Sequence, residues 1–207
     1  MRQKRHFLFG MILLGCSLLP AFGQSSQKDK DEKGDSPLGF GINVGNIRFY
    51  NSTFEFGLAP NIAYRFGDAF ALGFMLKTDY YYAKYRDPFN NKAYKFSAFD
   101  FGPTIFARYK PLWNWDNATS FLQGLFVQAE YERAFLKREA VDSGGGIIVV
   151  GDKIQKESFQ QNYMYIGIGA SSGYPFSTFV SIHYNLLDQY DSIRYPFNYR
   201  IGFTYNY

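Results

Sequence analysis

The stretch that decides the fold is Asn198–Tyr207, NYRIGFTYNY. One parity is wholly apolar or aromatic: Tyr199, Ile201, Phe203, Tyr205 and Tyr207. The other parity holds only polar residues and one Gly. Because successive side chains of a β-strand point to opposite faces, this alternation predicts a strand with one apolar face. We expect that strand to begin at Phe197.

The same period of two continues through the chain from Pro37 onward. Seven further alternating segments can be marked, at 38–49, 53–66, 69–85, 97–109, 120–135, 160–171 and 178–188. Segment 53–66 shows the pattern best, since its apolar face holds seven alternating positions from Phe54 to Phe66. No long stretch has the 3.6-residue period of an amphipathic helix. The sequence therefore predicts an all-β domain over residues 37–207.

The apolar faces are long enough to cross a hydrocarbon layer, and aromatic residues gather toward their ends. A soluble β-sandwich also has alternating faces and stays an alternative. Here, however, the opposite face mixes Gly with charged residues instead of forming a uniform solvated surface. Within lipid, a β-sheet satisfies all its backbone groups only by closing on itself. We therefore predict an eight-stranded antiparallel up-and-down transmembrane β-barrel.

The polar parity of such a barrel points into its lumen. An unpaired buried charge is costly, so we expect the charged residues of this parity to pair with one another. The predicted lumen network consists of Glu55, Arg65, Lys77, Asp79, Asp100, Arg108, Glu130, Glu132 and Arg200. Eight strands enclose only enough space for side chains, which argues against an open pore. A narrow channel for small solutes stays an alternative.

The start of the chain has the features of an export signal. Residues 1–23 combine a basic beginning, the apolar run Phe7–Leu19 and a small-x-small cleavage site, as in a secretory signal peptide. Cys16 is the only cysteine, and its lipidation is an alternative to cleavage near Gly23. Residues 24–36 are polar and charged, which predicts a disordered leader. The signal holds three Lys and Arg residues and no Asp or Glu, so the remainder is nearly neutral and no nucleic-acid partner is predicted.

The chain resembles bacterial outer-membrane β-barrels, whose last strand ends in an aromatic residue. The resemblance rests on the signal peptide, the eight alternating segments and the last strand with Tyr207. Within that family it is most similar to the small Tyr- and Phe-rich barrels of Bacteroidota, the PorT-like or general outer-membrane β-barrel group. This resemblance implies a location in the outer membrane of a Gram-negative bacterium, in contact with outer-membrane lipid. It also implies that the barrel-insertion machinery recognises the last strand during biogenesis.

His183 is the only histidine outside the signal segment, so any Ser–His or His–metal chemistry must use it. Ser181 shares its strand face, with Glu130 or Glu132 as a nearby carboxylate. This keeps a lipid-modifying outer-membrane enzyme as an alternative. The inward parity and the lack of a matching motif favour a hydrogen-bonded structural histidine. We therefore predict no enzymatic activity, no metal site and no cofactor.

Two other features are candidates for contacts outside the barrel. Trp113 and Trp115, in the connector 111–119, are predicted to anchor the membrane interface. The polar connector 136–159 contains an apolar run that needs cover, formed by Ile147, Ile148, Val149 and Val150. This run either pairs in a hairpin or docks on an outer-membrane protein partner. The favoured interpretation is a structural or accessory subunit of an outer-membrane assembly.

Overall fold

A computed structural model of the chain describes residues 36–50, 52–86, 92–144, 146–187 and 196–207. The predicted signal peptide 1–23 lies outside the described residues, as does the predicted leader 24–36 except for Ser36. Eight long strands make the main sheet: β1 (Leu38–Tyr50), β2 (Thr53–Phe66), β3 (Phe70–Arg86), β4 (Ala93–Tyr109), β5 (Leu125–Glu139), β8 (Lys156–Ser172), β9 (Phe176–Asn185) and β10 (Phe197–Tyr205).

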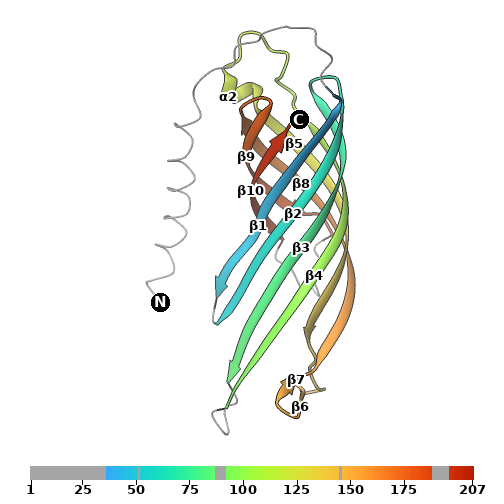
Figure 1. The fold of residues 1–207 in the computed structure, drawn as a ribbon, viewed down its shortest axis with the longest axis vertical. Coiled ribbons are helices and arrows are strands. Elements are labelled where there is room, and N and C mark those ends of the chain that lie inside the picture. The colour runs from blue at the N-terminus through green and yellow to red at the C-terminus, as the bar shows by residue number, and fades with distance from the viewer. Residues whose placement is uncertain (1–35, 51, 87–91, 145, 188–195) are drawn as a thin grey trace.

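These strands form one closed barrel in the order β1-β10-β9-β8-β5-β4-β3-β2 (Figure 1). Every neighbouring pair is antiparallel, and the first and last strands close the ring by pairing Phe40–Gly45 with Arg200–Tyr205. The predicted eight-stranded antiparallel up-and-down barrel is confirmed. Its strands alternate between an inward and an outward face, as the period of two requires.

The two ends of the barrel differ. At one end, called the turn end, short connections join β2 to β3 and β8 to β9, and Tyr207 lies at the same end (Figure 1). The connector 110–124 also lies there. At the other end, called the loop end, longer segments join β3 to β4, β5 to β8 and β9 to β10. The connector 110–124 is an exception to the expectation that the longest connectors share one end, because it is longer than the β3–β4 connector yet lies at the turn end.

Three strands reach well beyond their alternating apolar pattern toward the loop end. β4 begins at Ala93, β5 ends at Glu139 and β8 begins at Lys156. These additions take in parts of the connectors that we placed at 86–96 and 136–159. The reason is that outward positions of the extensions are polar, for example Lys95 and Lys137, so the apolar alternation stops while the pairing continues.

The predicted start of the fifth strand is wrong. Ser120–Gln123 forms the short helix α2 at the turn end, and β5 begins only at Leu125. The Leu122 N–H donates to the side chain of Thr119 (3.5 Å), which caps the helix. No helix within the described ranges is both long and apolar enough to cross a membrane.

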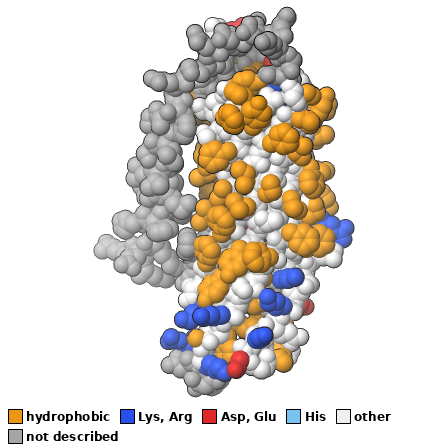
Figure 2. All heavy atoms as spheres, in the orientation of Figure 1, with side chains coloured by type: hydrophobic (Ala, Val, Ile, Leu, Met, Phe, Trp, Pro, Cys, Tyr) orange, Lys and Arg blue, Asp and Glu red, His pale blue; other side chains and the backbone are white. Residues whose placement is uncertain are grey.

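The outward face is covered with apolar side chains. Figure 2 shows them spread over the barrel wall, with Lys and Arg side chains gathered beyond them toward the loop end. Exposed fractions are 58% for Ile105, 63% for Ile168 and 75% for Phe176. We call this outward apolar surface the belt. In a soluble β-sandwich this face would be buried against a second sheet, so the fold disagrees with that alternative.

Tyr207 does not share the outward face of its strand, contrary to our prediction. β10 ends at Tyr205, and Asn206 has a left-handed backbone (φ 65°) that reverses the direction of the next side chain. Tyr207 is therefore buried inside the turn end, where its ring centroid lies 6.2 Å from that of Phe106. Its hydroxyl donates to Asn61 Oδ1. Tyr199, Ile201, Phe203 and Tyr205 point outward as predicted.

Candidate functional site: the polar lumen

Glycines on the inner face make room for large side chains of the neighbouring strand. Four cross-strand pairs have this form: Gly73 with Phe106, Gly169 with Phe126, Gly202 with Phe179 and Gly167 with His183. A Cβ atom at Gly167 would lie 2.3 Å from His183 Nδ1, and one at Gly202 would lie 2.4 Å from the Phe179 ring. Each large side chain thus lies across a glycine and fills the lumen.

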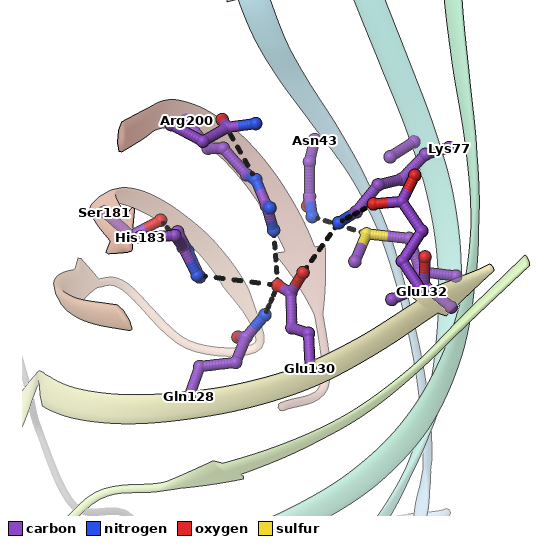
Figure 3. A network of polar contacts seen from close by, with 12 residues as sticks. Asn43, Lys77, Gln128, Glu130, Glu132, Ser181, His183 and Arg200 are labelled. Atoms are coloured by element: carbon purple, nitrogen blue, oxygen red, sulfur yellow. Dashed lines mark hydrogen bonds and ion pairs between the residues drawn. The ribbon is translucent and has the colours of Figure 1, made fainter. Parts of the chain in front are cut away.

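A buried ion-pair network occupies the middle of the barrel (Figure 3). Lys77 Nζ donates to Glu130 Oε2 and to Glu132 Oε2, at 2.8 Å each. Arg200 Nη1 donates to Glu130 Oε1, and Gln128 Nε2 reaches the same oxygen at 2.6 Å. We call Lys77, Gln128, Glu130, Glu132 and Arg200 the central network. Its side chains come from β3, β5 and β10, and they join opposite walls of the barrel.

The central network is balanced in charge and removed from solvent. Its two cations face two carboxylates, and the side chains of Glu130 and Glu132 are fully buried. Lys77 Nζ also lies 4.5 Å from the centroid of the Tyr165 ring. Because a buried charge is tolerated only when it is paired, this arrangement explains how polar residues fill the core. The network closes the lumen at this level.

Ser181, His183 and Glu130 lie in the order of a serine-hydrolase triad (Figure 3). Ser181 Oγ is 3.0 Å from His183 Nε2, and His183 Nδ1 is 3.6 Å from Glu130 Oε1. The second distance is too long for a hydrogen bond, and Nδ1 has no hydrogen-bond partner. His183 is 1% exposed, and Glu130 is already held by Lys77 and Arg200.

The nine predicted lumen charges do not form one ring. Lys77, Glu130, Glu132 and Arg200 belong to the central network. Toward the loop end, Asp100 Oδ2 accepts from Arg138 Nη1 (2.7 Å) and Asp100 Oδ1 accepts from the Lys137 N–H (2.8 Å). Asp79 is buried opposite Gly57, and Glu55 is partly buried on the same wall. Arg65 and Arg108 lie at the turn end.

Two groups that complete these contacts, Arg138 and Gln128, were not among the predicted site residues. Arg138 supplies the cation for Asp100, although it stands at the end of β5 where alternating patterning had stopped. Gln128 links Glu130 to Arg108, since its Oε1 accepts from Arg108 Nε at 2.7 Å. The one sequence signal for Gln128 was its position on the inward-facing parity of the strand. Within the described residues, no group of three His, Cys, Asp or Glu side chains could hold a metal ion.

The apolar run in the connector after β5 is divided between inside and outside. Ile147 and Val149 pack against a cluster at the loop end that contains Ala83, Phe96 and Ile154. Val149–Val150 (β6) pairs with Lys153–Ile154 (β7) in a small hairpin, and Val150 is 67% exposed. The run therefore takes part in a hairpin, as one of the two interpretations expected. Its exposed member is Val150.

The two tryptophans lie in the connector at the turn end. Trp115 is 52% exposed, whereas Trp113 is partly buried and borders a pocket with Lys110. The Lys110 Nζ atom lies 5.0 Å from the centroid of the Trp113 ring. Their predicted role as anchors at a membrane interface stays a prediction.

No family model matches the chain, and no curated protein matches it. Among solved structures, the chain is similar to the N-terminal β-barrel domain of Pseudomonas aeruginosa OprF, at 13% sequence identity and a TM-score of 0.45. That match covers 83% of this chain and 98% of the OprF domain.

Proposed function

We propose that the protein is an integral β-barrel of the outer membrane of a Gram-negative bacterium, without enzymatic activity. The observation that carries this proposal is the inverted distribution of side chains. The belt places Phe, Tyr, Ile and Leu on the outside, while Lys77, Glu130 and Arg200 lie inside. A closed barrel leaves no unpaired strand edge for lipid to meet.

The location is tested by fractionation of the native host. We expect the chain to sediment with outer membranes, to resist extraction with sodium carbonate, and to require detergent for solubility. A folded barrel should also migrate faster on electrophoresis when the sample is not boiled. Recovery in the soluble periplasmic fraction would contradict the proposal.

The role that we propose is that of a structural or accessory subunit of an outer-membrane assembly. The central network occupies the middle of the lumen, and we propose the outer wall and the loop end as the surfaces for contact with a partner. The hairpin β6–β7 projects at the loop end and presents Val150 (Figure 1). This role is tested by measuring the native mass of the tagged protein after gentle extraction. A stoichiometric companion supports it, and a lone monomer contradicts it.

A second candidate function is a lipid-modifying hydrolase or acyltransferase that uses His183. The observation in its favour is the 3.0 Å contact between Ser181 Oγ and His183 Nε2, with Glu130 beyond the ring. Labelling of intact protein with a fluorophosphonate probe tests it. Labelling that disappears in Ser181→Ala and in His183→Ala would establish this activity. The burial of all three side chains leads us to expect no labelling.

A further inference from the structure

A pocket at the turn end carries an excess of positive charge. Its cavity volume is about 20 Å³, and it opens to solvent on one side. The charged residues in its wall are three cations, Arg65, Arg108 and Lys110, and one carboxylate, Asp68. Trp113, Tyr174 and Tyr207 supply aromatic walls. In the central network and in the pair Asp100–Arg138, by contrast, cationic and acidic side chains balance.

None of these three cations lies within ion-pair distance of a carboxylate in the described part of the chain. By contrast, Lys77, Arg138 and Arg200 each contact one at the deeper levels. Two donor atoms of the pocket are also buried with no hydrogen-bond partner: Arg65 Nε and Arg108 Nη1. Buried donors in native proteins are nearly always satisfied, so these atoms indicate a missing acceptor.

Aromatic rings hold the cations in place without neutralising them. The Arg108 guanidinium lies among three rings, with its Cζ atom 4.2 Å from the centroid of Phe126, 4.7 Å from that of Phe179 and 5.1 Å from that of Tyr207. Arg65 Cζ lies 5.9 Å from the centroid of Tyr174. Burial, with Arg108 and Arg65 nearby, lowers the pKa of Lys110 to about 8. The site is thus built from fixed, partly desolvated positive groups.

We infer that this pocket binds a phosphate group, with Arg65 and Lys110 at its mouth and Arg108 behind them. Three cationic side chains against the single side-chain carboxylate of Asp68 leave an excess of positive charge, which favours an anion such as phosphate. Guanidinium groups also fit phosphate oxygens with two parallel hydrogen bonds. Phe70 borders the pocket and belongs to the belt, so a lipid headgroup can reach the site. A free phosphate can reach it from the aqueous side.

The inference is tested on the full-length chain, purified folded in detergent and free of phosphate. Inorganic phosphate is titrated into the wild type, Arg65→Gln, Lys110→Met and Lys95→Gln, with heat released as the readout. Lys95 is an exposed lysine at the loop end and serves as the matched control. We expect saturable binding that weakens about tenfold or more in the two pocket variants, because each loses a charge-assisted contact. Lys95→Gln should bind as the wild type does.

A second arm distinguishes the two sources of the phosphate. The same proteins are placed in nanodiscs of phosphatidylethanolamine and phosphatidylglycerol, and the lipids that stay bound are counted by native mass spectrometry. Retention that falls in Arg65→Gln/Lys110→Met, but not in Lys95→Gln, identifies a lipid headgroup. Binding of inorganic phosphate without such lipid retention identifies a free phosphate. Absence of both effects overturns the inference.

Faster migration of each unboiled variant on electrophoresis shows that it remains a folded barrel. A failure to bind phosphate is thereby separated from a failure of the barrel proposal itself. Arg108 is left unchanged because its burial among three rings makes its truncation a threat to folding.

Discussion

Glu130 is the residue on which the central network converges. Its two oxygens together accept from Lys77, Arg200 and Gln128, and its side chain is completely buried. A carboxylate in that position is stable only while its cations remain, because removing one partner leaves charge in a dry interior. The stability of the barrel should therefore depend more on these few side chains than on any exposed ion pair, such as Lys92 with Asp152.

Replacing Lys77 by Met should destabilise the barrel by about 3–5 kcal/mol, the usual effect of breaking a buried ion pair. The reason is that Glu130 and Glu132 both lose the contact with Lys77. Urea unfolding in detergent, followed by electrophoretic mobility, measures this. The double variant Lys77→Met/Glu132→Gln removes one charge of each sign and should recover part of the loss. Equal midpoints for wild type and Lys77→Met would show that the pair does not hold the lumen.

Lys110 should give the barrel a pH-dependent stability on the alkaline side. Its pKa is about 8 in the folded protein and about 10.4 in an unfolded chain. Between these values the unfolded state binds more protons, so the free energy of unfolding rises with pH through this window. Unfolding midpoints at pH 7 and pH 10 test this, with Lys110→Met as the reference. The wild type should gain more than the variant, and parallel curves would contradict the assignment.

At the scale of the elements, the strands fit together because glycine on one strand faces a bulky residue on the next. Gly167 opposite His183 and Gly202 opposite Phe179 show the rule. The bulky side chains can therefore lean across their neighbours without pushing the two strands apart. Gly is usually unfavourable inside a strand, and here its small size is the reason for its position.

The change Gly167→Ala should lower stability, because its Cβ would lie 2.3 Å from His183 Nδ1. The test is a double-mutant cycle with His183→Ala, measured by urea unfolding. In the His183→Ala background, the same Gly167→Ala change should cost much less. An additive cycle would show that the two positions do not compete for space.

The small hairpin at the loop end should be held down by Ile147 and Val149. Replacing both by Asp should expose the connector to added protease while the unboiled barrel keeps its fast migration. Val150→Asp is the matched control, since Val150 is 67% exposed and makes no such cover. Equal cleavage of the wild type, the double variant and Val150→Asp would contradict this packing.

Strands could be predicted from the sequence where apolar and polar residues alternate, and not where that alternation is absent. The strand 53–66 was predicted to the residue because alternation marks each position and turn residues bound it. Alternation fails where both faces are polar, as in Lys156–Ser158 at the start of β8. It also cannot reveal the reversal at Asn206, which depends on a single left-handed residue. Inward parity predicted which charges lie inside, but which of them meet depends on register and barrel closure.

For the whole molecule, the arrangement of the lumen predicts an electrically silent protein. The wild type should show no steady conductance in planar bilayers, because the central network joins opposite walls of the barrel. The deep glycine-supported rings of Phe126 and Phe179 close the same space nearer the turn end. Reproducible single-channel steps from the purified wild type would contradict this and favour the narrow-channel alternative.

The pairing of β1 with β10 has a consequence for the biogenesis of the barrel. This join spans Phe40–Gly45 and Arg200–Tyr205, so its two halves stand at opposite ends of the folded sequence. Every other neighbouring pair in the barrel joins strands that follow one another, counting β5 and β8 as consecutive. The ring therefore cannot close before β10 has been made. A barrel without β10 is an open sheet in which β1 and β9 each present an unpaired edge, so such a fragment should aggregate unless another protein covers those edges.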